Sequence, residues 1–164
     1  MKINLDTKFR RIALLVLLLA FLGTLAFIFV NSAMPPEKTV EISDAVGSAV
    51  GNIVKPETAV GGFVKIHLRK IAHFTEYGLL GIEIALFVLC FIRDIAGKIK
   101  LGISFAFLSF AVGFIDESIQ VLSGRNASIL DVWIDAGGYA TFYALTLLVG
   151  VLTHLITRKV NNGK

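Results

Sequence analysis

The chain alternates between long apolar runs and short polar segments. The first run, 12–30, contains no charged residue, and the others cover about 70–92, 101–122 and 131–156. A helix needs roughly 20 apolar residues to cross the hydrocarbon of a bilayer. The pattern therefore predicts an all-α, polytopic membrane protein with four transmembrane helices. The first run is longer than the apolar part of a cleavable signal peptide, so we expect it to be retained.

The segment 31–62, between the first two predicted spans, has a different pattern. Pro35-Pro36 ends the first helix. After it, apolar residues recur at the spacing of one helical face from Ile42 to Val54. This predicts a short amphipathic helix outside the membrane, either on the lipid surface or packed on the ends of the spans. We favour packing, because the polar face lacks the Lys and Arg of an anionic-lipid binder. Gly61-Gly62 would then form a flexible joint before the second span.

Composition agrees with a membrane protein. Of 164 residues, 55% are hydrophobic and only 17% are charged, and the mean hydropathy is +0.78. Soluble domains are usually less apolar and more charged. The length suits a single domain, 1–164. Cys90 is the only cysteine, so an intramolecular disulfide and a thiolate metal cluster are excluded.

The basic residues are concentrated in three short segments: the N-terminus, the connection between the second and third spans, and the C-terminus. Together these segments hold ten Lys and Arg against two carboxylates, a net charge of +8. The rest of the chain holds six against ten, or −4, which gives the overall +4. Positively charged loops stay in the cytoplasm. We therefore expect both termini to be cytoplasmic and 31–62 to be external. The same distribution argues against nucleic-acid binding.

Ionisable residues occur near one end of the predicted spans, where burial in hydrocarbon is costly and usually marks a functional site. The residues concerned are His73, Glu76, Asp116, Glu117, Asp131 and Asp135. His73 and Glu76 share one helical face, as do Asp116 and Gln120. Glu117 is turned by about 100° from Asp116 and faces elsewhere in this interpretation.

Helical rise places the deeper carboxylates at similar depth. Glu76 and Asp116 each lie roughly 9 Å inside the outer end of their span, and Asp135 about 6 Å. Arg125 lies in the connection above them. The sequence thus predicts a polar pocket open to the outside. Simpler interpretations exist for single members: Asp131 suits a helix N-terminus through the macrodipole. Glu83, deeper in the second span, could be a protonated acid hydrogen-bonded between helices.

Three motifs in this region resemble the VanZ-like family. Residues 70–77, KIAHFTEY, resemble its K-x-x-H-F-x-x-Y motif, and 116–120, DESIQ, its D-E-x-x-Q motif. Arg125, Ser128 and Asp131 fall at its R-x-x-S-x-x-D spacing. Three motifs in order make the match fairly specific. Asp135 replaces the usual asparagine of the family, and Ser123 replaces a frequent proline.

The resemblance implies a bacterial cytoplasmic-membrane protein that acts at the cell envelope. The family takes its name from a member associated with resistance to the glycopeptide teicoplanin. No reaction follows from this resemblance. Residues of the motifs and of the predicted pocket are the candidate ligand-binding residues: Lys70, Tyr77, Glu117, Gln120, Ser128, Asp131 and Asp135.

The residues leave three functions open. In the first, the pocket binds the head group of a membrane lipid or cell-wall precursor. Its phosphate would accept charge-assisted hydrogen bonds from Arg69, Lys70 and Arg125. In the second, the protein is an enzyme acting on such a lipid. Its candidate catalytic residues are His73 as base, Asp116 or Glu76 to orient it, and Arg125 for developing negative charge. The third is proton-coupled transport or scrambling, with Glu76 and Glu83 as a relay. A transporter of four spans would need to form a homodimer.

Charge balance raises a further question. Five carboxylates face few cations, so at least one must be protonated or a cation must be bound. We expect no cofactor and Asp135 to be the protonated group. The metal alternative would place Mg²⁺, Ca²⁺ or Mn²⁺ on Glu76, Asp116, Asp131 and Asp135.

Overall fold

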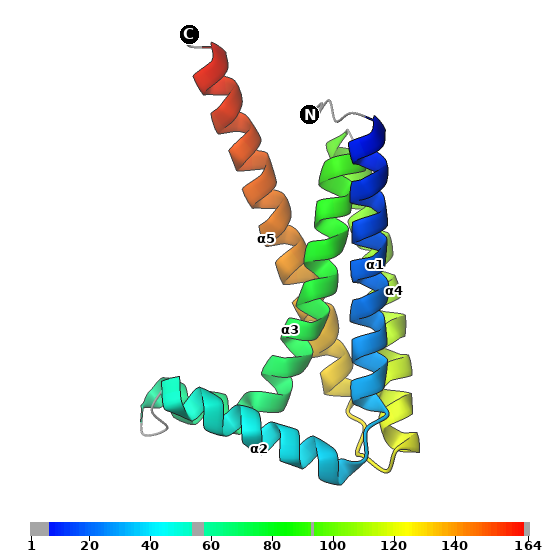
Figure 1. Cartoon of the computed structure of the whole chain (residues 1–164), viewed down its shortest axis with the longest axis vertical. Helices are drawn as coiled ribbons and strands as arrows, with labels where there is room; N and C mark the ends of the chain where they lie inside the picture. Colours follow the sequence, from blue (N-terminus) through cyan, green and yellow to red (C-terminus); the bar gives the residue numbers. More distant parts are fainter. Residues whose placement is uncertain (1–6, 54–57, 93, 163–164) are drawn as a thin grey trace.

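The structure is a computed structural model that describes residues 7–53, 58–92 and 94–162. Over these residues the chain forms helices joined by short connections (Figure 1). In chain order they are α1 (Thr7–Ser32), α2 (Pro36–Ile53), α3 (Ala59–Phe91), α4 (Ile95–Leu122) and α5 (Ile129–Asn162).

Four of the helices are long and apolar enough to cross a membrane, which confirms the predicted all-α, four-span class. The candidate spans are Lys8–Ser32, His67–Phe91, Ile95–Leu122 and Ile129–Thr157. Large apolar side chains cover the outside of the bundle, with Phe107 75% exposed. Such a surface is unfavourable in water and suits contact with lipid chains.

Polar side chains set where two of the helices begin. Thr58 precedes α3, and its hydroxyl oxygen accepts a hydrogen bond from the amide of Gly61. Asp94 caps α4 in the same way through the amide of Gly97, at 2.5 Å. Because α3 starts at Ala59, Gly61-Gly62 lies inside a helix. The predicted flexible joint is therefore wrong: the Thr58 cap outweighs the low helix propensity of glycine.

The helices α3 and α5 form the most extensive contact in the bundle. Small residues permit it: a Cβ at Gly138 on α5 would overlap the backbone carbonyl of Phe74 on α3. Further along, Tyr77, Tyr139 and Val88 belong to the buried core between these helices. Close approach here brings polar side chains of α3 and α5 within hydrogen-bond reach of each other.

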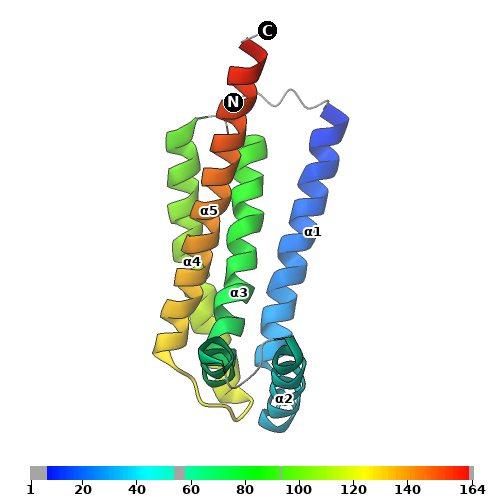
Figure 2. The ribbon, with the colours of Figure 1, turned by 90° about the vertical axis from the view of Figure 1, so that its left-hand side faces the viewer.

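The two ends of the bundle differ. The start of α1 and the end of α5 lie at one end, with the start of α4 (Figures 1 and 2). Opposite them, α2 runs across the axes of the long helices, near the connection between α4 and α5. Most of the basic residues that predict the orientation therefore lie far from α2. Lys2, Arg93 and Lys164, which contribute to that prediction, lie outside the described residues.

Candidate functional site

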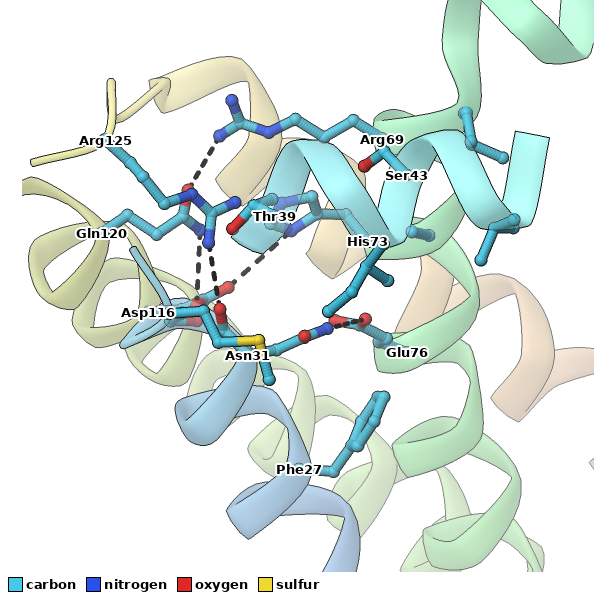
Figure 3. A pocket seen from close by; sticks show the side chains of 16 residues that line it. Phe27, Asn31, Thr39, Ser43, Arg69, His73, Glu76, Asp116, Gln120 and Arg125 are labelled. Atoms are coloured by element: carbon cyan, nitrogen blue, oxygen red, sulfur yellow. Dashed lines mark hydrogen bonds and ion pairs between the residues drawn. The ribbon is translucent and has the colours of Figure 1, made fainter. Parts of the chain in front are cut away.

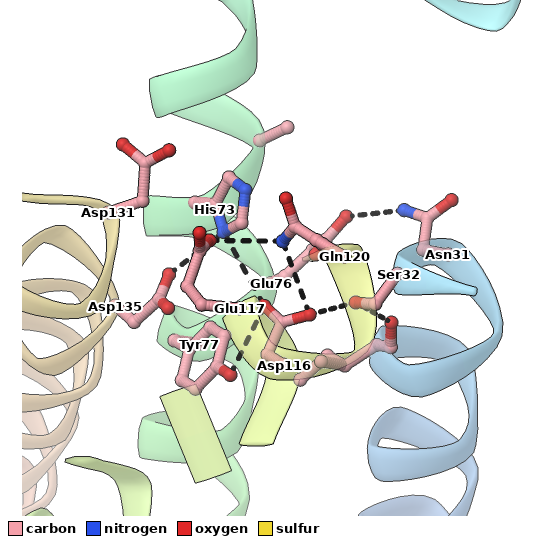
Figure 4. A network of polar contacts seen from close by, with 12 residues as sticks. Asn31, Ser32, His73, Glu76, Tyr77, Asp116, Glu117, Gln120, Asp131 and Asp135 are labelled. Carbon is pink, nitrogen blue, oxygen red and sulfur yellow. Dashed lines mark hydrogen bonds and ion pairs between the residues drawn. The ribbon is translucent and has the colours of Figure 1, made fainter. Parts of the chain in front are cut away.

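A cluster of ionisable and amide side chains is buried between α3, α4 and α5 at the end near α2 (Figure 4). Each of its members is at most 6% exposed. This polar cluster consists of His73, Asp116, Glu117, Gln120, Asp131 and Asp135. All six were singled out in the sequence, and the structure brings them together.

His73 joins the three helices of the cluster. Its Nδ1 lies 3.1 Å from Oδ1 of Asp135 on α5 and 3.7 Å from Oδ2 of Asp116 on α4. The hydroxyl of Tyr77, one turn along α3, donates to the same Oδ2 of Asp116 at 3.5 Å. A ring nitrogen between two carboxylates is held in one orientation, as a general base or a metal ligand would need.

Asp116 also connects the cluster to α1. The hydroxyl of Ser32, the last residue of α1, donates to Oδ1 of Asp116. The side-chain amide of Gln120 donates to the same oxygen at 3.4 Å. The sequence reasoning missed Ser32. The available signal was a polar pair, Asn31-Ser32, directly after an uncharged span.

Glu117 corrects one interpretation of the sequence, because its side chain points into the cluster. Its Oε1 accepts from Nε2 of Gln120 at 3.0 Å, and its Oε2 accepts from the backbone amide of Ser128 at 2.6 Å. The connection between α4 and α5 thus folds back onto the last turns of α4. The prediction considered only which residues share one face of α4, so it did not include the backbone amide of Ser128 as a partner of Glu117.

Arg69 closes the outer side of the cluster. Its Nη2 lies 3.3 Å from Oδ2 of Asp131 and donates to Oε1 of Gln120 at 2.8 Å. The side chain remains 43% exposed. Asp131 lies in the first turn of α5. It therefore combines the favourable position at a helix N-terminus with an ion pair.

A cavity of about 370 Å³ lies beside the cluster, between α1, α2, α3 and α4 (Figure 3). Its polar lining comes from Asn31, Ser32, Thr39, Ser43, Arg69, His73, Glu76, Asp116, Gln120 and Arg125. Its apolar lining comes from Phe27, Met34, Ile42, Val46, Leu68 and Ala72. The predicted amphipathic helix α2 is therefore a wall of the cavity. The volume and the mixed lining suit a small amphiphile.

Two arginines face the outer part of this cavity. Arg125 Nη1 donates to the backbone oxygen of Asn31 at 3.1 Å. The side-chain amide of Asn31 in turn donates to Oε1 of Glu76 at 2.9 Å. Arg125 and Arg69 also line a second, shallower space of about 420 Å³ under α2. Burial, and then the positive charge of Arg69, lowers the pKa of Arg125 below its ordinary value. Both arginines line the cavity, and the carboxylates Asp116, Glu117 and Glu76 act on the pKa of Arg125 in the opposite direction.

Not every candidate residue reaches the cavity. His73, Glu76, Asp116, Gln120 and Arg125 line it. Four further candidates are buried and do not line it: Tyr77, Glu117, Asp131 and Asp135. Ser128 donates its backbone amide to Glu117. Lys70 is exposed and is not part of the lining.

Metal-ligand spacing occurs twice among the described residues. In His73, Asp116 and Asp135, one donor atom of each residue lies within 4.8 Å of the others, and the same holds for His73, Glu117 and Asp131. Glu76, part of the set considered from the sequence, belongs to neither group.

The VanZ/LLP1 family model matches residues 9–150, which include the cluster, the cavity and most of the four long helices. No curated protein and no solved structure matches the chain.

Proposed function

The chain belongs to the VanZ/LLP1 family, and from this premise we propose that it binds the anionic head group of a lipid or lipid-linked cell-wall precursor. The protein is a multi-pass membrane protein with four candidate spans. In this proposal it lies in the bacterial cytoplasmic membrane, with the cavity open to the outer leaflet. It would modulate susceptibility to glycopeptides such as teicoplanin by holding such a lipid.

The observation that carries the proposal is that two arginines, Arg69 and Arg125, line one cavity that also has an apolar wall. Guanidinium groups bind phosphate oxygens through paired, charge-assisted hydrogen bonds. Both arginines line the cavity, and Phe27 and Leu68 line it as well. A head group would contact the arginines while the start of its chains contacts the apolar side chains.

Orientation supports an outer-leaflet site. Lys8, Arg10 and Lys100 lie at the end of the bundle opposite α2 (Figure 1). By the positive-inside rule, we expect that end to lie in the cytoplasm. The cavity would then face the side on which cell-wall precursors are used.

Ligand titration tests this proposal, with the adjacent residues Arg69 and Lys70 as a matched pair of cations. We would measure binding of short-chain phosphatidic acid to purified protein, using Arg69→Ala, Arg125→Ala and Lys70→Ala. The arginine variants should bind about 10- to 150-fold more weakly, since a charged hydrogen bond contributes about 1.5–3 kcal/mol. Lys70→Ala should bind like wild type, because Lys70 is exposed outside the cavity. Equal affinity in all four proteins would contradict the proposal.

A second candidate function is an enzyme that acts on the same lipid. The pair of His73 and Asp135 at 3.1 Å favours it, because His73 also lines the cavity. Asp135 would hold the ring while His73 accepts a proton from a water or hydroxyl in the cavity. Lipid mass spectrometry separates the two functions: cells with and without the protein should contain lipids of the same masses if it only binds them.

A further inference from the structure

Asp135 has an unusual environment for a carboxylate. The residue is 0% exposed, and its Oδ1 lies next to His73. Its Oδ2 is buried and has no hydrogen-bond partner among the described residues. Leaving a buried carboxylate oxygen without a partner costs free energy, so such an atom calls for an explanation.

A proton does not fully explain this atom. A proton on Oδ2 would need an acceptor, and the described residues supply none. A proton on Oδ1 would lie between Asp135 and His73 and would leave Oδ2 without a donor. A positive charge beside Oδ2 satisfies the oxygen in its ordinary ionised form.

Gly113 on α4 leaves the position beside this oxygen without a side chain. A Cβ added there would lie 3.2 Å from Oδ2 of Asp135 and 3.3 Å from Cγ1 of Val132, so a side chain at this position would crowd the oxygen. Gly113 and Asp116 are three residues apart and share one face of α4. The unpartnered oxygen therefore lies over the same face that carries the second carboxylate.

We infer that His73, Asp116 and Asp135 form a binding site for a divalent cation. Their donor atoms lie within 4.8 Å of one another, as ligands of one ion do. One imidazole with two carboxylates is a donor set for Mn²⁺ or Zn²⁺. Ca²⁺ fits less well, because it prefers six to eight oxygen ligands.

The second group, His73 with Glu117 and Asp131, is the weaker choice. Both oxygens of Glu117 accept short hydrogen bonds, from Gln120 at 3.0 Å and from the backbone amide of Ser128 at 2.6 Å, whereas Oδ2 of Asp116 accepts only the 3.5 Å contact from Tyr77 in the described part of the chain. Asp131 is paired with Arg69. Among the described residues, Asp116 and Asp135 have no Lys or Arg ion pair, and His73 is the group that faces both of them.

The inference goes beyond lipid binding and can be tested without any lipid. Full-length protein, purified in detergent and stripped with a chelator, is titrated with Mn²⁺, Zn²⁺, Mg²⁺ and Ca²⁺ by calorimetry. Wild type should bind one Mn²⁺ or Zn²⁺ per chain, more tightly than Mg²⁺ or Ca²⁺. Asp135→Asn keeps the shape of the side chain but removes its charge, and it should weaken binding about tenfold or more.

Two further variants keep the test decisive. Gly113→Ala retains every ligand and only fills the space beside Oδ2, so it should also weaken binding. If Asp135→Asn does not fold, Gly113→Ala decides. Glu83→Gln is the control: it changes another buried carboxyl that belongs to neither ligand group. The absence of binding by wild type, or equal binding by all variants, or an equal loss in Glu83→Gln, would overturn the inference.

Discussion

Nδ1 of His73 lies 3.1 Å from Oδ1 of Asp135, and this contact links α3 to α5 inside the polar cluster. Both side chains are buried. The same nitrogen lies near Asp116 on α4. One imidazole on α3 therefore contacts a buried carboxylate on each of two other helices.

Removing this imidazole should destabilise the bundle. His73→Ala leaves Asp116 and Asp135 buried without their shared partner, and removing the hydrogen-bond partner of a buried polar group costs about 1–3 kcal/mol. We expect a clearly lower thermal midpoint in detergent, measured by intrinsic fluorescence. His67→Ala, which changes a half-buried histidine whose ring lies against that of Phe63, is the control. Equal midpoints for the two variants would mean that the contact of His73 with the acids contributes nothing.

Two adjacent glycines on α5 provide a separate test of the α3–α5 contact. A Cβ at Gly138 would overlap the backbone of Phe74, whereas one at Gly137 would meet nothing within 4 Å. Gly138→Ala should cost about 1–3 kcal/mol or more through overpacking. Gly137→Ala should be neutral or slightly stabilising, because alanine favours the helix. Similar thermal midpoints for both variants would contradict this packing.

Much of the fold follows from the hydrophobic pattern. The apolar runs predict the long helices because a segment that crosses a bilayer must satisfy its backbone hydrogen bonds internally, which a helix does. Periodicity also predicts α2, although it does not reveal that α2 covers a cavity. Helix starts were less predictable: Thr58 and Asp94 cap their helices through side-chain hydrogen bonds that no periodicity encodes.

The site was predictable where its residues share a helical face. Arg69, His73 and Glu76 follow the spacing i, i+4 and i+7 and all line the cavity. Lys70 is turned about 100° from Arg69 and is exposed. The roles of Ser32 and Glu117 could not be derived this way, because each depends on a contact with a residue outside its own helix. That Asp135 is protonated stays a prediction, which the metal titration tests.

Glu117 should hold the connection between α4 and α5 in place. Its Oε2 accepts a 2.6 Å hydrogen bond from the amide of Ser128, just before α5. Glu117→Ala should free that amide at a cost of about 1.5–3 kcal/mol. Faster hydrogen exchange over residues 126–130 would show it. Ser118→Ala changes the exposed neighbour, which bonds only within α4, and should leave exchange there unchanged.

The orientation of the chain can be tested with single cysteines. With Cys90 replaced by serine, a cysteine at Lys38 on α2 should react with an impermeant thiol reagent on intact cells. A cysteine at Lys100, exposed near the start of α4, should react only after the membrane is opened. Lys98 is unsuitable, because its side chain is buried and donates to the backbone of α3. The reverse labelling would place the cavity on the cytoplasmic side.

Glu76 and Glu83 distinguish head-group binding from proton-coupled transport. A relay would need a polar path between them, yet the two acids line different cavities. Glu83 accepts a 2.7 Å hydrogen bond from Thr24 and lines a cavity of about 180 Å³ among side chains such as Leu18 and Phe87. Leu80, between them on α3, is only 3% exposed.

We therefore expect Glu83→Gln to behave like wild type in a teicoplanin susceptibility assay, because the amide oxygen can still accept from Thr24. Glu76→Gln removes a negative charge from the proposed anion-binding cavity, so it should not lower protection either, whereas a proton relay would lose it. Expression of both variants is checked by immunoblot of membranes. Loss of protection in Glu83→Gln, with normal expression, would show that the acid at mid-span takes part in the function. A binding site near α2 does not require that acid, whereas a proton relay does, and transport would then become the better account.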